Sequence, residues 1–83
     1  MPYIKNEDKQ RLQHGAAPKT AGELNYAIHL LLDKFILHNN LSYQTCNDIM
    51  GALQGVQQEF YRRKVAPYEN QKMITNGDID FYK

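Results

Sequence analysis

The stretch from Ser42 to Lys64 constrains the fold of this chain most, because it has the two-sided pattern of a long amphipathic helix. Apolar residues recur every three or four positions on one side and form the seam of a packed helix: Cys46, Ile49, Leu53, Val56 and Phe60. Polar residues and two glycines follow the opposite side. Each glycine inside a helix costs about 1 kcal/mol relative to alanine. Gly51 and Gly55 therefore indicate that a partner helix or a ligand comes close to this backbone.

A second amphipathic helix precedes this stretch. Thr20 and Glu23 have the spacing of a capping box, in which the threonine caps the helix and the glutamate reaches back. The seam of this helix consists of Leu24, Ile28, Leu31 and Phe35. The connection to the N-cap at Ser42 is short, so we expect the two helices to form an antiparallel hairpin with facing seams.

The remaining segments complete a single all-α domain. We expect an N-terminal arm with an extended start and a short helix that is capped by Asn6 and loosely attached through Leu12. Pro67 removes an amide from the helical ladder and clashes with the preceding turn, so the long helix should end or kink near Val65. The predicted boundaries are 1–19 for the arm and short helix, 20–38, 42–65 and 67–75 for the later helices, and 76–83 for an extended tail.

Composition excludes several classes of function. A chain of 83 residues buries only about 60% of its surface, and oligomerisation is the usual way for it to gain buried area. The net charge of +1 gives no basic stripe for a nucleic-acid polymer. No apolar run approaches the roughly 20 residues of a membrane span, and the N-terminus lacks the apolar core of a signal peptide. A single cysteine cannot form an internal disulfide, so we expect a reducing, cytoplasmic compartment. Together, these features predict a homo-oligomer without membrane contact.

No pattern of catalytic or metal-binding residues is present. The three histidines are scattered, and none has the spacing of a metal-ligand pair. Cys46 lies on the apolar seam, where a small buried side chain is expected rather than a nucleophile. Gly51 and Gly55 lie inside a helix and lack the lysine of a phosphate-binding loop. The sequence therefore predicts a protein that is not an enzyme and that holds no metal or cofactor.

Basic and tyrosine side chains gather at the end of the long helix. Three consecutive cations at a helix C-terminus also complement the helix dipole, which is a purely structural explanation. The functional alternative is an anion site, because arginine binds phosphate through a planar fork and tyrosine stacks on a base. Asn25 can read a base edge, although it can equally bridge to a neighbouring helix while Tyr26 packs at the rim. The candidate ligand-binding residues are Asn25, Tyr26, Arg62, Arg63, Tyr68 and Lys72.

Five blocks of the chain resemble, in order, a family of small proteins found in phages and bacteria. The blocks are Tyr3-Ile4-Lys5, Gly22-Glu23-Leu24-Asn25-Tyr26, Glu59-Phe60-Tyr61-Arg62-Arg63, Val65-Ala66-Pro67-Tyr68-Glu69 and Asn76-Gly77-Asp78. The resemblance to that family implies no particular activity for this chain. By size and architecture alone, the chain is also similar to the small helical phage sponge proteins that oligomerise and sequester the cyclic nucleotide signals of antiphage defence, such as CBASS.

The second likeness implies a phage-type immune-evasion sponge. Such a protein would bind a cyclic dinucleotide, or a similar phosphorylated small molecule, without catalysis, as a dimer or tetramer in the cytoplasm of the bacterial host. The alternative is a non-catalytic protein–protein interaction or structural module that uses the Gly51 and Gly55 face of the long helix.

Overall fold

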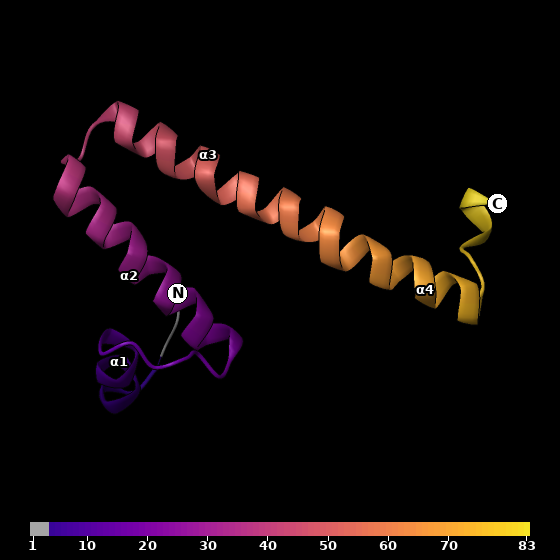
Figure 1. Cartoon of the computed structure of the whole chain (residues 1–83), viewed down its shortest axis with the longest axis horizontal. Coiled ribbons are helices and arrows are strands. Elements are labelled where there is room, and N and C mark those ends of the chain that lie inside the picture. The colour runs from indigo at the N-terminus through magenta and orange to yellow at the C-terminus, as the bar shows by residue number, and fades with distance from the viewer. Residues whose placement is uncertain (1–3) are drawn as a thin grey trace. The chain divides into compact units, whose positions relative to one another are not determined.

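The computed structural model describes residues 4–83, and its regular structure is helical (Figure 1). The elements are α1 (Asn6–Gln13), α2 (Ala21–Asn39), α3 (Tyr43–Phe60), the π-helical segment η1 (Tyr61–Val65), α4 (Ala66–Asn76) and the 3₁₀ turn η2 (Asp80–Tyr82). No strand occurs among the described residues, so the predicted all-α class is confirmed. The start of the predicted N-terminal arm, residues 1–3, lies outside the described residues.

The chain forms two compact units, one that ends at Cys46 and one that runs from Asn47 to Lys83. The predicted packing of the α2 seam against the α3 seam would join these units, and it stays a prediction.

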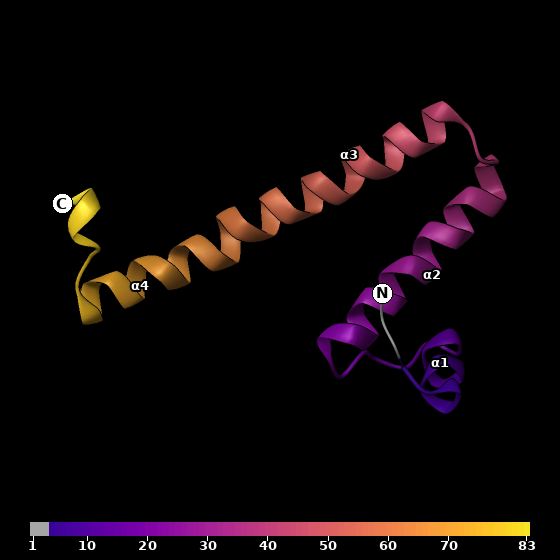
Figure 2. The ribbon, with the colours of Figure 1, turned by 180° about the vertical axis from the view of Figure 1, so that it is seen from behind.

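In the first unit, α1 lies beside the first turns of α2 (Figures 1 and 2). Leu12 is 5% exposed and is the one buried hydrophobic residue in the described part of the chain. Arg11 of α1 forms an ion pair with Glu23 of α2, and Gln13 donates a hydrogen bond to the hydroxyl of Tyr26 at 2.7 Å. The expected attachment through Leu12 is present, and these polar contacts add to it; its looseness stays a prediction.

The predicted caps of the two longer helices are confirmed. Thr20 Oγ1 accepts the amide of Glu23 at 3.1 Å, and Ser42 Oγ accepts the amide of Thr45 at 3.0 Å. Glu23 accepts the amide of Lys19 at 2.9 Å. Each predicted helix boundary is correct to within about one residue at these ends.

The predicted cap of α1 is wrong. Asn6 is already the first residue of the helix, and Lys5 occupies the capping position without a side-chain hydrogen bond. The backbone of Lys5 is extended, with φ −70° and ψ 153°, so the chain turns into the helix one residue earlier than a cap at Asn6 requires. The acidic first turn of Glu7 and Asp8 is present as expected and favours this helix end.

The long helix does not stop near Val65, and Figure 2 shows its ribbon continuing into α4. The amide of Ala66 donates to the carbonyl of Tyr61, five residues earlier, so one turn is widened into a π-helix. A wider turn moves the preceding carbonyls away from the ring of Pro67 and tolerates its missing amide. The predicted break is therefore replaced by a π-helical segment. The tail after Gly77 is extended only as far as Ile79 and then forms η2.

Several residues of the two apolar seams are exposed within their own units. Exposed fractions are 52% for Leu24, 40% for Phe35, 68% for Val56 and 60% for Phe60. Cys46, expected to be buried, is also exposed. In the described residues from 47 onward, no residue is buried.

None of the helices within residues 4–83 combines the length and the apolar character of a membrane-spanning helix.

Candidate functional site

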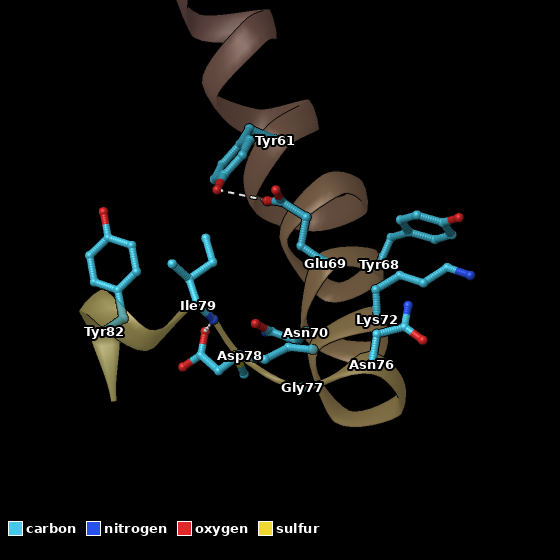
Figure 3. Close-up of a pocket in the computed structure, with 11 residues that line it drawn as sticks. Tyr61, Tyr68, Glu69, Asn70, Lys72, Asn76, Gly77, Asp78, Ile79 and Tyr82 are labelled. Carbon is cyan, nitrogen blue, oxygen red and sulfur yellow. Dashed lines mark hydrogen bonds between the residues drawn. The ribbon is translucent and has the colours of Figure 1, made fainter.

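The second unit has an open pocket of about 520 Å³ between η1, α4 and the C-terminal tail (Figure 3). Its volume lies within the range of about 300–1,000 Å³ typical of small-molecule sites. Tyr61, Tyr68 and Tyr82 supply aromatic rings to the lining, and Glu69, Lys72 and Asp78 supply charges. Two of the six predicted ligand residues, Tyr68 and Lys72, therefore line one pocket.

The π-helical segment aligns two residues of this lining. Residues eight apart in a regular α-helix differ by about 80° around the axis, whereas one extra residue in a π turn brings them onto the same side. The hydroxyl of Tyr61 donates a hydrogen bond to Glu69 Oε1 at 2.9 Å, as Figure 3 shows. This hydrogen bond to a carboxylate raises the pKa of Tyr61 above its ordinary value.

Tyr68 and Lys72 form a second pair on α4. The ammonium of Lys72 lies 5.6 Å from the centroid of the Tyr68 ring, which is a cation–π distance. In Figure 3 both side chains point away from Tyr82 and the tail. The pair offers a cation beside an aromatic face. The carboxylates of Glu69 and Asp78 make the rest of the lining less favourable for an anion.

Arg62 and Arg63 meet at a different place. Arg62 Nη2 lies 2.8 Å from Glu59 Oε2, and Arg63 Nη1 lies 3.2 Å from Glu59 Oε1. The two guanidinium side chains are 70% and 68% exposed, so these ion pairs are screened by solvent. The structure brings the two arginines together around one carboxylate but does not bring them into the pocket of Tyr68.

A shallow groove of about 610 Å³ runs along α3 beside this ion-pair cluster. It is lined by Gly55, Val56, Glu59, Phe60, Arg63 and Lys64. A Cβ atom added at Gly55 or at Gly51 would have nothing within 4 Å. No residue of the second unit therefore accounts for the two glycines.

Asn25 and Tyr26 belong to the first unit. Tyr26 accepts the hydrogen bond from Gln13 and helps to hold α1, which is the packing alternative for this residue. The main-chain oxygen of Asn25 accepts a hydrogen bond from His29 Nδ1 at 2.8 Å, and Asn25 itself is exposed. Of the six predicted ligand residues, the structure therefore brings together two pairs, Tyr68 with Lys72 and Arg62 with Arg63. Neither unit brings more than two of them to one place.

Sequence reasoning missed Glu59 and Glu69 as partners of the candidate residues. Glu59 stands three and four positions before the two arginines, a spacing that signals ion pairs on a helix. Glu69 gives no such signal, because its partner Tyr61 lies eight positions away and faces it only through the π turn.

No group of three or more histidine, cysteine, aspartate or glutamate side chains in residues 4–83 is placed to hold a metal ion. A family model described as "Domain of unknown function (DUF6899)" matches residues 1–79, which is nearly the whole chain and includes parts of both units. No curated protein and no solved structure matches the chain.

Proposed function

We propose that this chain, which belongs to the DUF6899 family, is a non-catalytic protein that assembles with copies of itself through the glycine face of α3, the side that carries Gly51 and Gly55. The observation that carries the proposal is the open space at both glycines. Glycine inside a helix is unfavourable unless another backbone or a ligand needs the room. Since nothing within the second unit uses that room, a second copy is the partner we propose.

The exposed apolar seams support the same proposal. An isolated helix is only marginally stable in water, and most helical stability comes from packing of an apolar face. The continuous helix formed by α3, η1 and α4 has segments of 18, 5 and 11 residues, whereas α2 has 19 residues. Even if α2 packs on this long helix, it is too short to cover its whole length. Apolar surface of the long helix is therefore left for another copy to bury.

The test of this proposal is a pair of glycine substitutions with a matched control. Gly51→Leu and Gly55→Leu should each lower the molar mass in solution to that of a monomer, 9.7 kDa, because leucine fills the space that the partner needs. Gln57→Leu places the same side chain on another side of α3 and should leave the assembly intact. If both glycine variants had the same molar mass in solution as the assembled wild type, the glycine-face contact would be refuted.

A second candidate function is the phage-type immune-evasion sponge, favoured by the cation–π pair of Tyr68 and Lys72 in the open pocket. In this hypothesis the protein acts in the bacterial host cytoplasm and sequesters a cyclic dinucleotide or a similar phosphorylated molecule. Arg62, Arg63 and Lys72 would bind phosphate. Tyr68 would stack on a base.

A thermal-shift and calorimetry screen against cyclic di- and trinucleotides tests the sponge. A ligand that binds only the folded protein raises the melting temperature by mass action, and the bound ligand should be recovered intact after denaturation. Absence of both heat and thermal shift would leave the interaction module as the function, and recovery of a cleaved product would identify an enzyme instead.

A further inference from the structure

We infer that the C-terminal tail of one copy, residues 78–82, docks in the groove beside Gly55 of a second copy. This inference rests on the proposed self-assembly and names the contact that forms it. The groove and the tail are both exposed parts of the second unit, and their chemistry is complementary.

The groove combines an apolar floor with a basic rim. Val56 and Phe60 are 68% and 60% exposed, and Gly55 leaves the helix backbone bare beside them. Arg63 and Lys64 stand at one end. Glu59 neutralises part of this charge through its ion pairs, but three consecutive cations, residues 62–64, outnumber that one carboxylate. Such a surface fits an aromatic segment that carries negative charge.

The tail has that composition. Ile79, Phe81 and Tyr82 are large apolar or aromatic residues, and they are 66%, 84% and 72% exposed. The Phe81 and Tyr82 rings lie edge to face with centroids 5.0 Å apart, so the two rings form one aromatic pair. Asp78 and Asp80 interleave with these residues. Asp80 pairs with Lys83 at 3.1 Å, a contact open to solvent and easily exchanged for another cation.

The tail cannot reach the Gly55 end of the groove of its own chain. From Gly77 to Phe81 the chain spans at most about 14 Å when fully extended. From Gly77 back to Gly55 the helix covers 22 positions, or about 33 Å along its axis. The aromatic pair would therefore fall far short of Gly55 even with its side chains pointing toward it. A second copy is the occupant that brings this tail to the Gly55 end of the groove.

Mixing two defective variants tests the inference. Phe81→Ala removes the aromatic anchor and keeps the groove, whereas Gly55→Leu fills the groove and keeps the tail. Each variant alone should sediment as a 9.7 kDa monomer, and an equimolar mixture should form a species of about twice that mass through one intact junction. Tyr43→Ala is the matched control, since Tyr43 is as exposed as Phe81, and it should assemble like the wild type.

A fluorescent variant reports the same contact directly. The chain contains no tryptophan, so Phe81→Trp places a unique emitter on the tail. Its emission should shift to the blue as the protein concentration rises, and Gly55→Leu in the same chain should abolish the shift.

The outcomes separate this inference from the proposed function. A wild-type protein that stays monomeric at every concentration would overturn both. Wild-type assembly that survives Phe81→Ala would overturn the tail contact alone and leave the glycine face in place. Mixing without recovery of the heavier species would show that the groove receives a helix or another protein rather than the tail.

Discussion

Arg11 in α1 donates a hydrogen bond to the carboxylate of Glu23, twelve positions away at the start of α2. The same carboxylate accepts the amide of Lys19 at 2.9 Å, and Arg11 also donates to the carbonyl of Ala17 at 3.0 Å. The bond to Arg11, followed by the bond from Lys19, lowers the pKa of Glu23, and the pKa of Arg11 is raised in return. This cluster holds the short first helix to the second one.

The stability contributed by this ion pair should depend on pH. Since the folded-state pKa of Glu23 is lowered, the contribution is complete above the ordinary glutamate pKa, about 4.3, and is lost as the pH falls through the lowered value. The amide resonances of α1 should shift toward unfolded positions in that acidic window. Glu23→Gln should loosen α1 at neutral pH already, whereas Glu7→Gln, on the exposed side of α1, should not. An α1 that titrates identically in both variants would contradict the role of Glu23.

Truncation of Leu12 should destabilise the first unit most among its leucines. Leu12→Ala removes a 5% exposed side chain, and such core truncations cost about 2–5 kcal/mol. Leu37→Ala is the control, because Leu37 is 75% exposed and surface changes usually stay within about 0.5 kcal/mol. Urea denaturation compares the two variants. Equal midpoints would mean that α1 adds nothing to the stability of the unit.

Replacement of Pro67 should convert the π turn of the long helix into a regular α-helical turn. Pro67→Ala restores the missing amide, and proline inside a helix is about 3 kcal/mol less favourable than alanine, so stability should rise by up to that amount. The π turn is then no longer needed, and Glu69 should rotate away from Tyr61. The pKa of Tyr61, followed by NMR, should return toward its ordinary value. A lower stability, or an unchanged Tyr61 pKa, would show that the π turn has another cause.

Removal of one arginine side chain should weaken ligand binding without lowering the stability of the unliganded protein. If the sponge hypothesis holds, Arg62→Ala or Arg63→Ala should weaken cyclic nucleotide binding by about ten- to a hundredfold, the value of a charge-assisted contact. The melting temperature of the unliganded protein should barely change, because both side chains are about two-thirds exposed. Lys34→Ala, in the other unit, is the control for a nonspecific charge effect. Equal affinities for the control and the arginine variants, measured by calorimetry, would remove the arginines from the site.

The features that could be predicted from sequence are those set by near neighbours. The caps at Thr20 and Ser42 depend on a side chain and an amide three positions apart, and the structure has both. The all-α class follows from apolar periodicity over whole helices, which one misplaced residue does not disturb. The pairing of Tyr68 with Lys72 is likewise a contact between residues four positions apart on one helix.

The features that could not be predicted depend on longer separations or on competing local effects. The ion pair between Arg11 and Glu23 joins two helices that are separated by a non-helical segment, so no helical periodicity in the sequence indicates it. At Pro67 a helix end, a kink and a widened turn compete, and the sequence prediction of an end or a kink did not include the π-helical turn.

The measurement that tests self-assembly most directly is sedimentation equilibrium of the wild-type chain over a range of micromolar concentrations. Our account predicts a molar mass that is a whole multiple of 9.7 kDa, with monomer appearing only on dilution. A mass of 9.7 kDa across the whole range would contradict it, since the open glycine face and the exposed apolar seam of α3 would then have no second copy to cover them.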